Sequence, residues 1–335
     1  MRLRRADCTI AGIRRKKSGK SFSYVDAEGR CISDPEVVNR IAALAIPPAW
    51  TDVWICPWPN GHIQATGVDV AGRKQYRYHD AWRGRQDQRK FDRMLDFARA
   101  LPGLRETLDG DLGRRGLVRE RVLACAVRLL DLGFFRVGAE RYAAENETYG
   151  LATLRRRHLR FEGGEAAFDY RSKGGKRHVQ SIADPTVLPT LRALKRRSGD
   201  RHGLLAYRNG RRWIDVRSEE VNEYIRDRSG GEFTAKDFRT WNATVLAAVA
   251  LARGDGEAPT RAARKRAIKA AVEEVADYMD NTPAVCRSAY IDPRVIDRCE
   301  SGETIRPALA RAASARNGGF ADRERIEAAV VALIE

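Results

Sequence analysis

The feature that most constrains the fold is a change in hydrophobic pattern near residue 90. Before it, short runs of Val, Ile, Thr and Tyr are separated by turn signals at Pro59-Asn60-Gly61 and Ala71-Gly72, which is typical of strands. From about residue 87, apolar residues recur at helical spacing, first at Phe91, Met94, Leu95 and Ala98. We therefore predict an α+β protein with two domains: a small, mainly-β N-terminal domain at residues 1–88 and a larger, mainly-α domain at residues 89–335.

The second part of the chain carries signals for several helices and for one small sheet. The predicted helices run from Val122 to a stop at Gly133, from a cap at Ser218 to Gly230, from a capping box at Thr234 and Asp237 to Gly254, over residues 260–280, and onward from Asp292-Pro293. Residues 159–182 are rich in β-formers and contain Gly-Gly turns at 163–164 and 174–175. This stretch predicts a three-stranded β meander within the helical domain.

The charge balance points to a polyanionic partner. The chain has 62 Lys and Arg against 45 Asp and Glu, a formal net charge of +17 with a pI near 10.0. Double-stranded DNA or another nucleic acid is the first candidate, and an anionic membrane surface is the second. The sequence has no apolar run of 18 residues, so we expect no membrane association.

The cysteines and histidines show no metal-binding pattern. The six cysteines form no Cys-x-x-Cys pair and the five histidines are dispersed. This distribution favours a reduced, cytoplasmic setting, and we expect neither a metal site nor a cofactor.

Five polar residues stand out, and they lie in four separate segments of the sequence. Arg136 lies in FFRVGAERYAAENETYGLATL, Lys173 in YRSKGGKRH and Arg239 in TAKDFRTWNATVL. Asn281 and Tyr290 are nine residues apart in NTPAVCRSAYIDP. Taken singly, each has an ordinary interpretation: a solvated charge, a turn lysine, a helix cap or a packing tyrosine. Taken in order, they form a pattern.

This ordered set resembles the type IB DNA topoisomerases, in particular their short bacterial and poxvirus branch. In that family the corresponding positions are two catalytic arginines, a lysine on a β-hairpin, a His or Asn, and a nucleophilic tyrosine. The glycine that usually precedes the lysine is Ser172 here, which leaves Lys176 as an alternative to Lys173. The phrases at residues 46–50 and 72–79 resemble the family's DNA-clamping domain. There the resemblance implies DNA contacts by Gln75, Tyr76 and Tyr78, flanked by Arg73 and Lys74.

The resemblance implies a two-lobed clamp around DNA that relaxes supercoils without ATP or metal. A tyrosine would form a transient 3′-phosphotyrosyl bond, the broken strand would rotate, and the 5′-hydroxyl would rejoin it. Arginines suit the charge that builds up on the phosphate oxygens, while a lysine can protonate the leaving oxygen. An asparagine can only donate or accept hydrogen bonds. The resemblance further implies a monomer, acting in the cytoplasm on the nucleoid.

Two alternatives use the same features. A tyrosine site-specific recombinase shares the chemistry, but usually has H-x-L-R before its second arginine, where this chain has Lys236-Asp237-Phe238-Arg239. Recombinases also exchange contacts between protomers, and the segment after Pro293 does not exclude this. A non-catalytic architectural DNA-binding protein would fit the charge equally well. Such a protein would keep all its measurable activities when Tyr290 is changed to Phe.

Overall fold

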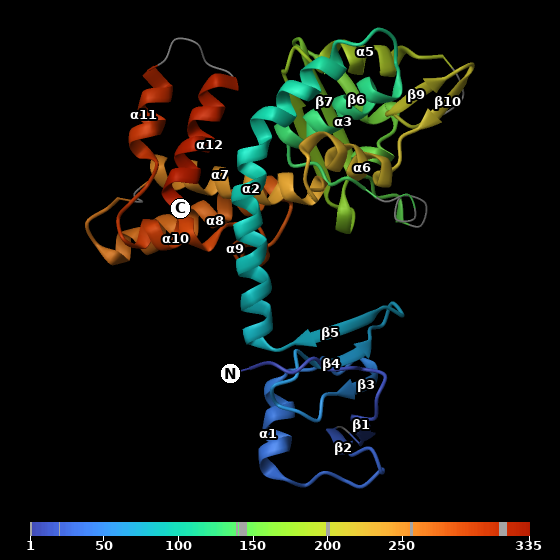
Figure 1. Cartoon of the computed structure of the whole chain (residues 1–335), viewed down its shortest axis with the longest axis vertical. Coiled ribbons are helices and arrows are strands. Elements are labelled where there is room, and N and C mark those ends of the chain that lie inside the picture. The colour runs from blue at the N-terminus through green and yellow to red at the C-terminus, as the bar shows by residue number, and fades with distance from the viewer. Residues whose placement is uncertain are drawn as a thin grey trace. The chain divides into compact units, whose positions relative to one another are not determined.

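The computed structural model describes residues 2–19, 21–138, 140, 146–198, 202–254, 257–314 and 320–335. The chain forms two compact units, an N-terminal unit of Met1–Asp92 and a C-terminal unit of Arg93–Glu335 (Figure 1). The first contains a five-stranded antiparallel sheet, and the second is mainly helical with a three-stranded antiparallel sheet. This confirms the predicted α+β class. None of the helices in the described residues is both long and apolar enough to cross a membrane.

The N-terminal unit is a sheet with one helix packed on it. Its strands, in the sheet order β2-β1-β3-β4-β5, are β1 (Ile13–Ser18), β2 (Ser21–Val25), β3 (Thr51–Ile55), β4 (Ile63–Val68) and β5 (Lys74–Tyr78). Helix α1 (Pro35–Ala43) contributes Ile41 to the core formed by the sheet. The sequence analysis missed α1, although Asp34 followed by Pro35 is a start signal. The Asp34 carboxylate caps the helix by accepting a hydrogen bond from the Glu36 N–H (2.9 Å).

The C-terminal unit contains the other elements. Its helices are α2 (Asp80–Leu112, which begins in the N-terminal unit), α3 (Arg119–Leu132), α5 (Leu188–Arg196), α6 (Ser218–Ser229), α7 (Ala235–Arg253), α8 (Arg261–Met279), α9 (Pro283–Ala289), α10 (Pro293–Glu300), α11 (Arg306–Ser314) and α12 (Phe320–Ile334). Its strands are β6 (Leu159–Glu162), β7 (Glu165–Arg171), β8 (Arg177–Ile182), β9 (Ala206–Asn209) and β10 (Arg212–Asp215). Three short 3-10 turns are η1 (Leu151–Thr153), η2 (Arg156–His158) and η3 (Lys173–Gly175).

Helix α7 is the centre of the C-terminal unit. It packs against α3, α6, α8, α10, α11 and α12, and most of its residues are buried, including Phe238 and Trp241. The capping box predicted from the sequence is present, because the Asp237 carboxylate accepts hydrogen bonds from the Thr234 N–H (2.8 Å) and hydroxyl (3.0 Å). Arg239, which lies in the first turns of α7 and is buried, is therefore held in the middle of the unit.

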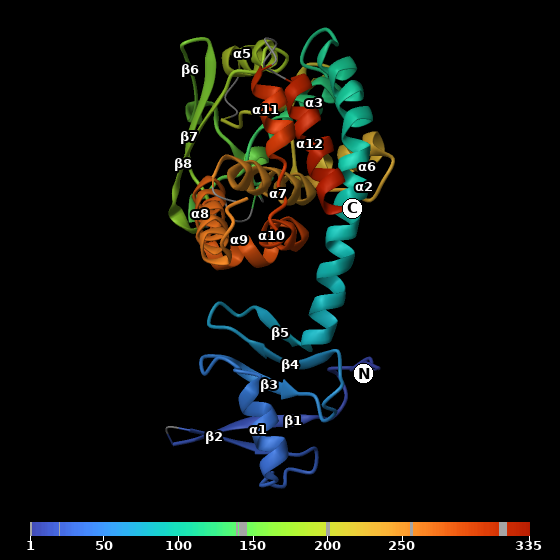
Figure 2. The ribbon, with the colours of Figure 1, turned by 90° about the vertical axis from the view of Figure 1, so that its left-hand side faces the viewer.

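The predicted meander is confirmed as the sheet β6-β7-β8. Alternate residues of β7 face inward, and the buried ring of Phe168 lies edge-on to Phe135, 5.1 Å between ring centres. Phe135 comes just after α3 and directly before Arg136. The packing of the meander, whose three strands are labelled in Figure 2, therefore fixes the segment that carries this arginine.

The structure corrects two helix starts. Ser218 is the first helical residue of α6, and Arg217 is the N-cap, whose N–H donates to the Glu220 carboxylate (3.1 Å). The helix expected from about residue 87 begins at Asp80. Residues 80–90 are mostly polar and exposed, so their helix has no apolar stripe for a periodicity search to find.

The sequence analysis also did not predict the β9–β10 hairpin or helices α5, α9, α11 and α12. The hairpin β9–β10 turns at Gly210 and Arg211, between the paired residues Asn209 and Arg212. Gly210 has a φ of 59°, and a glycine at the first position of a two-residue turn is a hairpin signal that was overlooked. Helix α9 follows Thr282, whose hydroxyl caps it, and begins with Pro283. It is only seven residues long and so has too few turns to show helical periodicity. The predicted stop at Gly133 and the cap at Asp292 are both confirmed.

The C-terminal helix α12 docks on its own chain. It packs against α7, α10 and α11. The buried Glu327 carboxylate accepts hydrogen bonds from the Arg105 guanidinium of α2 (2.6 and 2.8 Å), which also pairs with Asp131 of α3 (2.9 Å). Buried charges of this kind are stable only when paired. Helix α12 therefore completes an ion-pair network inside the C-terminal unit.

Candidate active site

The last residues of α8 form a sharp corner, which we call the α8 corner: Met279, Asp280 and Asn281. Asp280 has left-handed backbone angles (φ 53°, ψ 41°) and its N–H donates to the Ala276 carbonyl. Asp and Asn tolerate this conformation better than most residues. The last carbonyl groups of a helix lack partners within it, so the Met279 carbonyl is free to accept other donors.

Two arginines from distant parts of the chain converge on the α8 corner. Arg239, buried in α7, donates from Nη2 to the Met279 carbonyl (3.1 Å) and from Nη1 to the Phe134 carbonyl. Arg136, which is half-buried, donates from Nη2 to the same Met279 carbonyl (3.3 Å) and to Asn281 Oδ1 (3.2 Å). Three of the five predicted residues thus share one corner of the structure.

The two converging guanidinium groups repel each other electrostatically. Burial lowers the pKa of Arg239 to about 10, helped by the positive charge of Arg136 and opposed by the Tyr290 phenol. The guanidinium therefore remains charged at neutral pH, at an electrostatic cost that an anion would relieve. Within the described part of the chain, Arg239 Nε and Asn281 Nδ2 are buried without a hydrogen-bond acceptor. Two buried N–H groups at this place therefore lack an acceptor among the described residues.

Tyr290 lies at the end of α9, beside Arg239. Its N–H donates to the Cys286 carbonyl (3.0 Å), and its carbonyl accepts from the Thr244 hydroxyl of α7 (3.2 Å). The Arg239 guanidinium lies 5.6 Å from the centre of the tyrosine ring. The ring is half-buried. The tyrosine is therefore fixed by its backbone and paired with an arginine through its side chain.

Cys286 lies inside the same region. It is fully buried, with Sγ 3.6 Å from Met279 Sδ. Burial raises the pKa of the Cys286 thiol to about 11, although Arg239 and Arg136 act in the opposite direction. A thiol of this kind is an unreactive core residue at neutral pH.

Lys173 is not part of this cluster. It lies with Lys176 in the turn between β7 and β8, and both side chains are exposed. The turn is closed by the Ser172 N–H, which donates to the Lys176 carbonyl (2.7 Å), and it passes through Gly174 at a φ of 81°. In the described residues Lys173 makes no hydrogen bond or ion pair with the α8 corner. We call residues 172–176 the lysine hairpin.

The base of the lysine hairpin does reach the α8 corner. The Asp280 carboxylate Oδ2 lies 2.7 Å from His178 Nδ1 and accepts a hydrogen bond from the Ser172 hydroxyl (3.4 Å). The sequence analysis did not select His178 or Asp280, and no motif in the sequence singles them out. His178 lies two residues after Lys176, and Asp280 directly precedes Asn281. This proximity to predicted residues was the only sequence signal for the pair.

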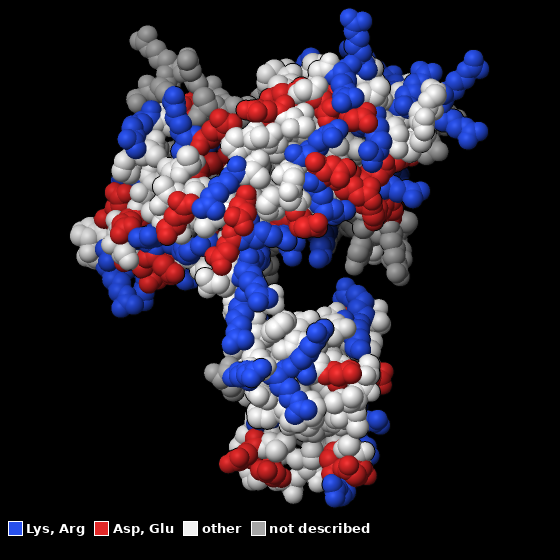
Figure 3. Space-filling view, viewed as in Figure 1, with Lys and Arg blue, Asp and Glu red and all other residues white. Residues whose placement is uncertain are grey.

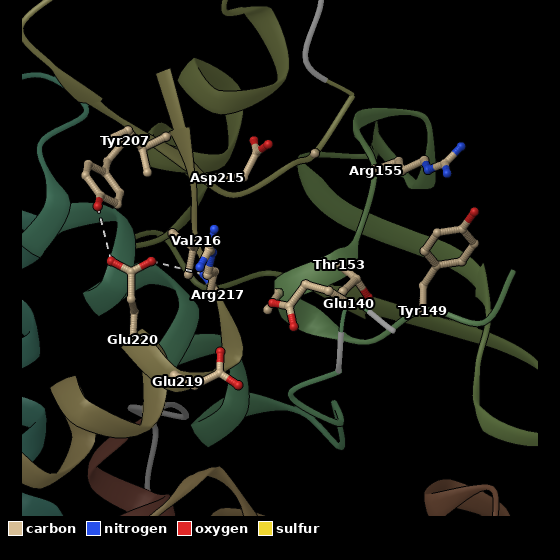
Figure 4. A pocket seen from close by; sticks show the side chains of 13 residues that line it. Glu140, Tyr149, Thr153, Arg155, Tyr207, Asp215, Val216, Arg217, Glu219 and Glu220 are labelled. Carbon is tan, nitrogen blue, oxygen red and sulfur yellow. Dashed lines mark hydrogen bonds between the residues drawn. The ribbon is translucent and has the colours of Figure 1, made fainter. Parts of the chain in front are cut away.

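A polar cavity lies elsewhere in the C-terminal unit, between the η1–η2 segment, the β9–β10 hairpin and the start of α6 (Figure 4). Its volume is about 890 Å³. Its carboxylates are partly engaged, since Glu220 accepts from the Tyr207 hydroxyl (3.1 Å). None of the five predicted residues lines it. We give more weight to the α8 corner because the converging cations are there.

The predicted DNA-contacting residues lie on or beside β5, the edge strand of the N-terminal sheet, and fall on two faces. Tyr76 and Tyr78 are exposed and stack on each other with 6.0 Å between ring centres, and Lys74 lies on the same face. Gln75 points to the other face and donates to Asp69 (2.9 Å), which also pairs with Arg73 (2.8 Å). Gln75 and Arg73 are therefore already engaged.

Charge is spread widely over the molecule. On the face shown in Figure 3, Lys and Arg side chains of the C-terminal unit are interspersed with Asp and Glu. The α8 corner thus differs from the general surface because two arginines, one buried and one half-buried, converge on it, which is the arrangement of a site for a phosphate-bearing substrate.

Comparison with known proteins assigns the family. Residues 79–307 match the family described as eukaryotic DNA topoisomerase I, catalytic core, and residues 21–69 match the bacterial DNA topoisomerase IB N-terminal domain. A DNA topoisomerase 1B of Acanthamoeba polyphaga mimivirus is 32% identical over 289 residues, which cover 84% of this chain and 85% of the viral protein. The chain belongs to the type IB DNA topoisomerases. Its substrate is DNA, and its activity is DNA relaxation.

Proposed function

We propose that Tyr290 is the nucleophile of the relaxation reaction. Its phenol oxygen would bond to a backbone phosphorus while the bond from phosphorus to the 5′-oxygen breaks, leaving the 3′-phosphate on the protein and a free 5′-hydroxyl. Because only about a thousandth of free tyrosine is ionised at neutral pH, the attacking phenol would give its proton to solvent. The Arg239 guanidinium lies 5.6 Å from the centre of the Tyr290 ring, which places a phosphate-binding cation beside the proposed nucleophile. This pairing is the single observation that carries the proposal.

Arg136 and Arg239 are proposed to bind the non-bridging oxygens of the scissile phosphate. The pentavalent transition state gathers negative charge on these oxygens, and rigid guanidinium groups stabilise it without having to reorganise. Both arginines are held by the Met279 carbonyl, so their spacing is set before DNA binds. With two fixed cations at the phosphate, the reaction has no need of a divalent metal to supply this charge.

Asn281 is proposed to donate a hydrogen bond to the same phosphate. Its Oδ1 accepts from Arg136 (3.2 Å), which leaves the Nδ2 group as the donor. This nitrogen is buried and has no acceptor among the described residues. A phosphate oxygen would complete its hydrogen bonding, and an uncharged amide would add no further repulsion between the two arginines.

Lys173 is proposed as the general acid that protonates the departing 5′-oxygen, with Lys176 as the alternative. Because the lysine hairpin is exposed at its tip, Lys173 would approach the scissile bond only when DNA is present. Religation reverses the steps: the 5′-hydroxyl attacks the phosphotyrosine and returns its proton to the lysine. The energy of the phosphodiester bond is kept in the covalent intermediate, so no ATP is required.

We further propose that one copy of the chain acts alone, in the cytoplasm on the nucleoid, with both units binding the same duplex. The exposed Tyr76, Tyr78 and Lys74 are the better candidates for direct DNA contact by the N-terminal unit, while Gln75 and Arg73 would first have to leave Asp69. The docking of α12 on its own chain favours a self-contained topoisomerase over a recombinase that exchanges a C-terminal helix.

The test is capture of the covalent intermediate. Wild-type protein is mixed with supercoiled plasmid in EDTA without ATP, denatured rapidly, and examined for protein joined to DNA. We expect relaxation and an adduct that maps to Tyr290 and to a DNA 3′ end. Tyr290→Phe should abolish both while DNA affinity stays within about threefold, because only one hydroxyl is lost.

The control for this test is Tyr278→Phe, which removes the hydroxyl of an exposed tyrosine on α8 and should leave both signals unchanged. An adduct that persists in Tyr290→Phe, or that maps to another residue, would contradict the proposal. So would a strict requirement for magnesium.

A further inference from the structure

The β7–β8 hairpin is tied to the α8 corner by a buried link that has no role in the chemistry described above. The link consists of the Asp280 carboxylate, the imidazole of His178 (2.7 Å) and the hydroxyl of Ser172 (3.4 Å). His178 and Ser172 are at least nine-tenths buried. They flank the turn that carries both candidate lysines, so the base of the lysine hairpin is held although its tip is exposed.

Asp280 is placed between the two residues that hold the arginines. The carbonyl of Met279 before it accepts from Arg136 and Arg239, and the side chain of Asn281 after it accepts from Arg136. Three consecutive residues therefore contact the two arginines and the lysine hairpin. A shift of the Asp280 side chain relative to its neighbours is restricted by the left-handed backbone, which is fixed by the hydrogen bond to Ala276.

His178 is held on its other sides as well. Its Nε2 lies 3.3 Å from Gln180 Oε1, and its ring packs against Tyr170 (5.2 Å between ring centres) and Phe135 (6.1 Å). The Gln180 amide lies over Gly133, where a Cβ would come within 2.4 Å of Gln180 Nε2. The imidazole is therefore a rigid connection from β8 to the corner and to the end of α3.

We infer that His178 and Asp280 are positioning residues, which hold the base of the lysine hairpin at a fixed place relative to the phosphate-binding corner. The inference rests on the proposed role of Lys173 as general acid. Its physical basis is that proton transfer requires the donor within hydrogen-bond distance of the leaving oxygen, and small misplacements of a catalytic group cost large factors in rate. Neither residue would touch the DNA.

This role can be separated from a general structural one by changing the leaving group. In the normal reaction the bond from phosphorus to the 5′-oxygen breaks and the oxygen takes a proton from the lysine. If a sulfur atom replaces that bridging oxygen, the bond from phosphorus to sulfur breaks and a thiolate leaves. Thiols have pKa values near 8.5, far below those of alcohols, so the thiolate needs no proton donor. Residues that act only through Lys173 then lose their importance.

The experiment measures single-turnover cleavage of a short duplex that contains a strong cleavage site, mapped beforehand, with oxygen or sulfur at the 5′-bridging position. The variants are His178→Phe, which keeps a ring among Tyr170 and Phe135, and Asp280→Gly, which suits the left-handed backbone. We expect each to cleave the oxygen substrate at least about tenfold more slowly than wild type. On the sulfur substrate each should lie within about threefold of wild type.

The controls separate failure of this inference from failure of the proposed function. Asp169→Asn breaks an exposed ion pair with Arg177 on the same two strands (2.7 Å) without touching the α8 corner, and should behave as wild type. Lys173→Ala should be slow on oxygen and restored on sulfur, and if it is not, the proposed role of Lys173 is wrong. If Lys173→Ala is restored but the two link variants are equally slow on both substrates, or if they are not slowed at all, the inference is wrong.

Discussion

The α8 corner and the tip of the lysine hairpin belong to the same unit but are built in opposite ways. At the corner, Arg239 is buried and Arg136 half-buried, both are bound to a helix-end carbonyl, and Arg239 lies beside the Tyr290 ring. At the tip, Lys173 is exposed in a glycine-containing turn. The proposed phosphate-binding groups are therefore positioned by folding alone, whereas the proposed proton donor would reach its place only when DNA binds.

This contrast has a physical reason. Cations that bind a phosphate act best when they do not have to reorganise. A lysine buried beside two guanidinium groups would face like-charge repulsion and would lose its proton. A lysine in solvent avoids this repulsion until a DNA phosphate is present to offset it.

The largest effect is expected at the preassembled corner. Arg239→Lys should lower the cleavage rate by about 10²–10³-fold, because an ammonium group bonded to the Phe134 and Met279 carbonyls keeps one N–H for a phosphate and cannot offer the forked pair of a guanidinium. Single-turnover cleavage of a duplex substrate measures this effect. Arg253→Lys, an exposed position at the end of the same helix, is the matched control. Equal rates for the two variants would show that the geometry of Arg239 is unimportant.

The next effect distinguishes the two lysines of the hairpin. Lys173→Ala should slow cleavage by about 10²-fold, as expected for loss of a general acid, whereas Lys176→Ala should change it by less than about threefold. Both side chains are exposed on the same turn, so neither change should disturb folding. The same cleavage assay decides the matter. The opposite result would assign the proton donor to Lys176.

The smallest effect concerns Gly133, which packs against Gln180 beneath the α8 corner and the lysine hairpin. Gly133→Ala should lower the free energy of unfolding by about 1–3 kcal/mol, because its Cβ would meet the Gln180 amide and the Phe135 ring within 3 Å. Gly110→Ala, in α2 where the Cβ meets nothing within 4 Å, should raise it by about 0.5–1 kcal/mol. Urea unfolding of both variants gives the comparison. A stabilising Gly133→Ala would show that Gln180 moves aside at no cost.

Much of the fold was predictable because its signals are local. The capping box of Thr234 and Asp237, the stop at Gly133 and the cap at Asp292 involve residues within four positions of one another. The meander was predictable from two Gly-Gly turns. The start of α2 was missed because it lacks an apolar face, and α9 was missed because it is short.

The candidate site was predictable as a set of residues but not as an arrangement. A resemblance to a family named Arg136, Arg239, Asn281 and Tyr290, and the comparisons with known proteins confirm the family. Nothing in the sequence indicates that one carbonyl, that of Met279, receives two arginines 143 and 40 residues away. Asp280 and His178 are joined across 102 residues, and such pairs depend on tertiary packing that no local pattern encodes.

The nine-residue interval between Asn281 and Tyr290 acquires a geometric meaning from helix α9. The interval is occupied by the Thr282 cap and the seven residues of the helix. The number of residues there therefore sets the rotation of Tyr290 about the helix axis relative to Asn281. Each residue of an α-helix turns the chain by about 100° and advances it by about 1.5 Å. One inserted residue would therefore rotate the phenol away from Arg239 while hardly lengthening the segment. The length of the interval therefore sets the direction in which the Tyr290 side chain points, and the interval tolerates substitution far better than a change in length.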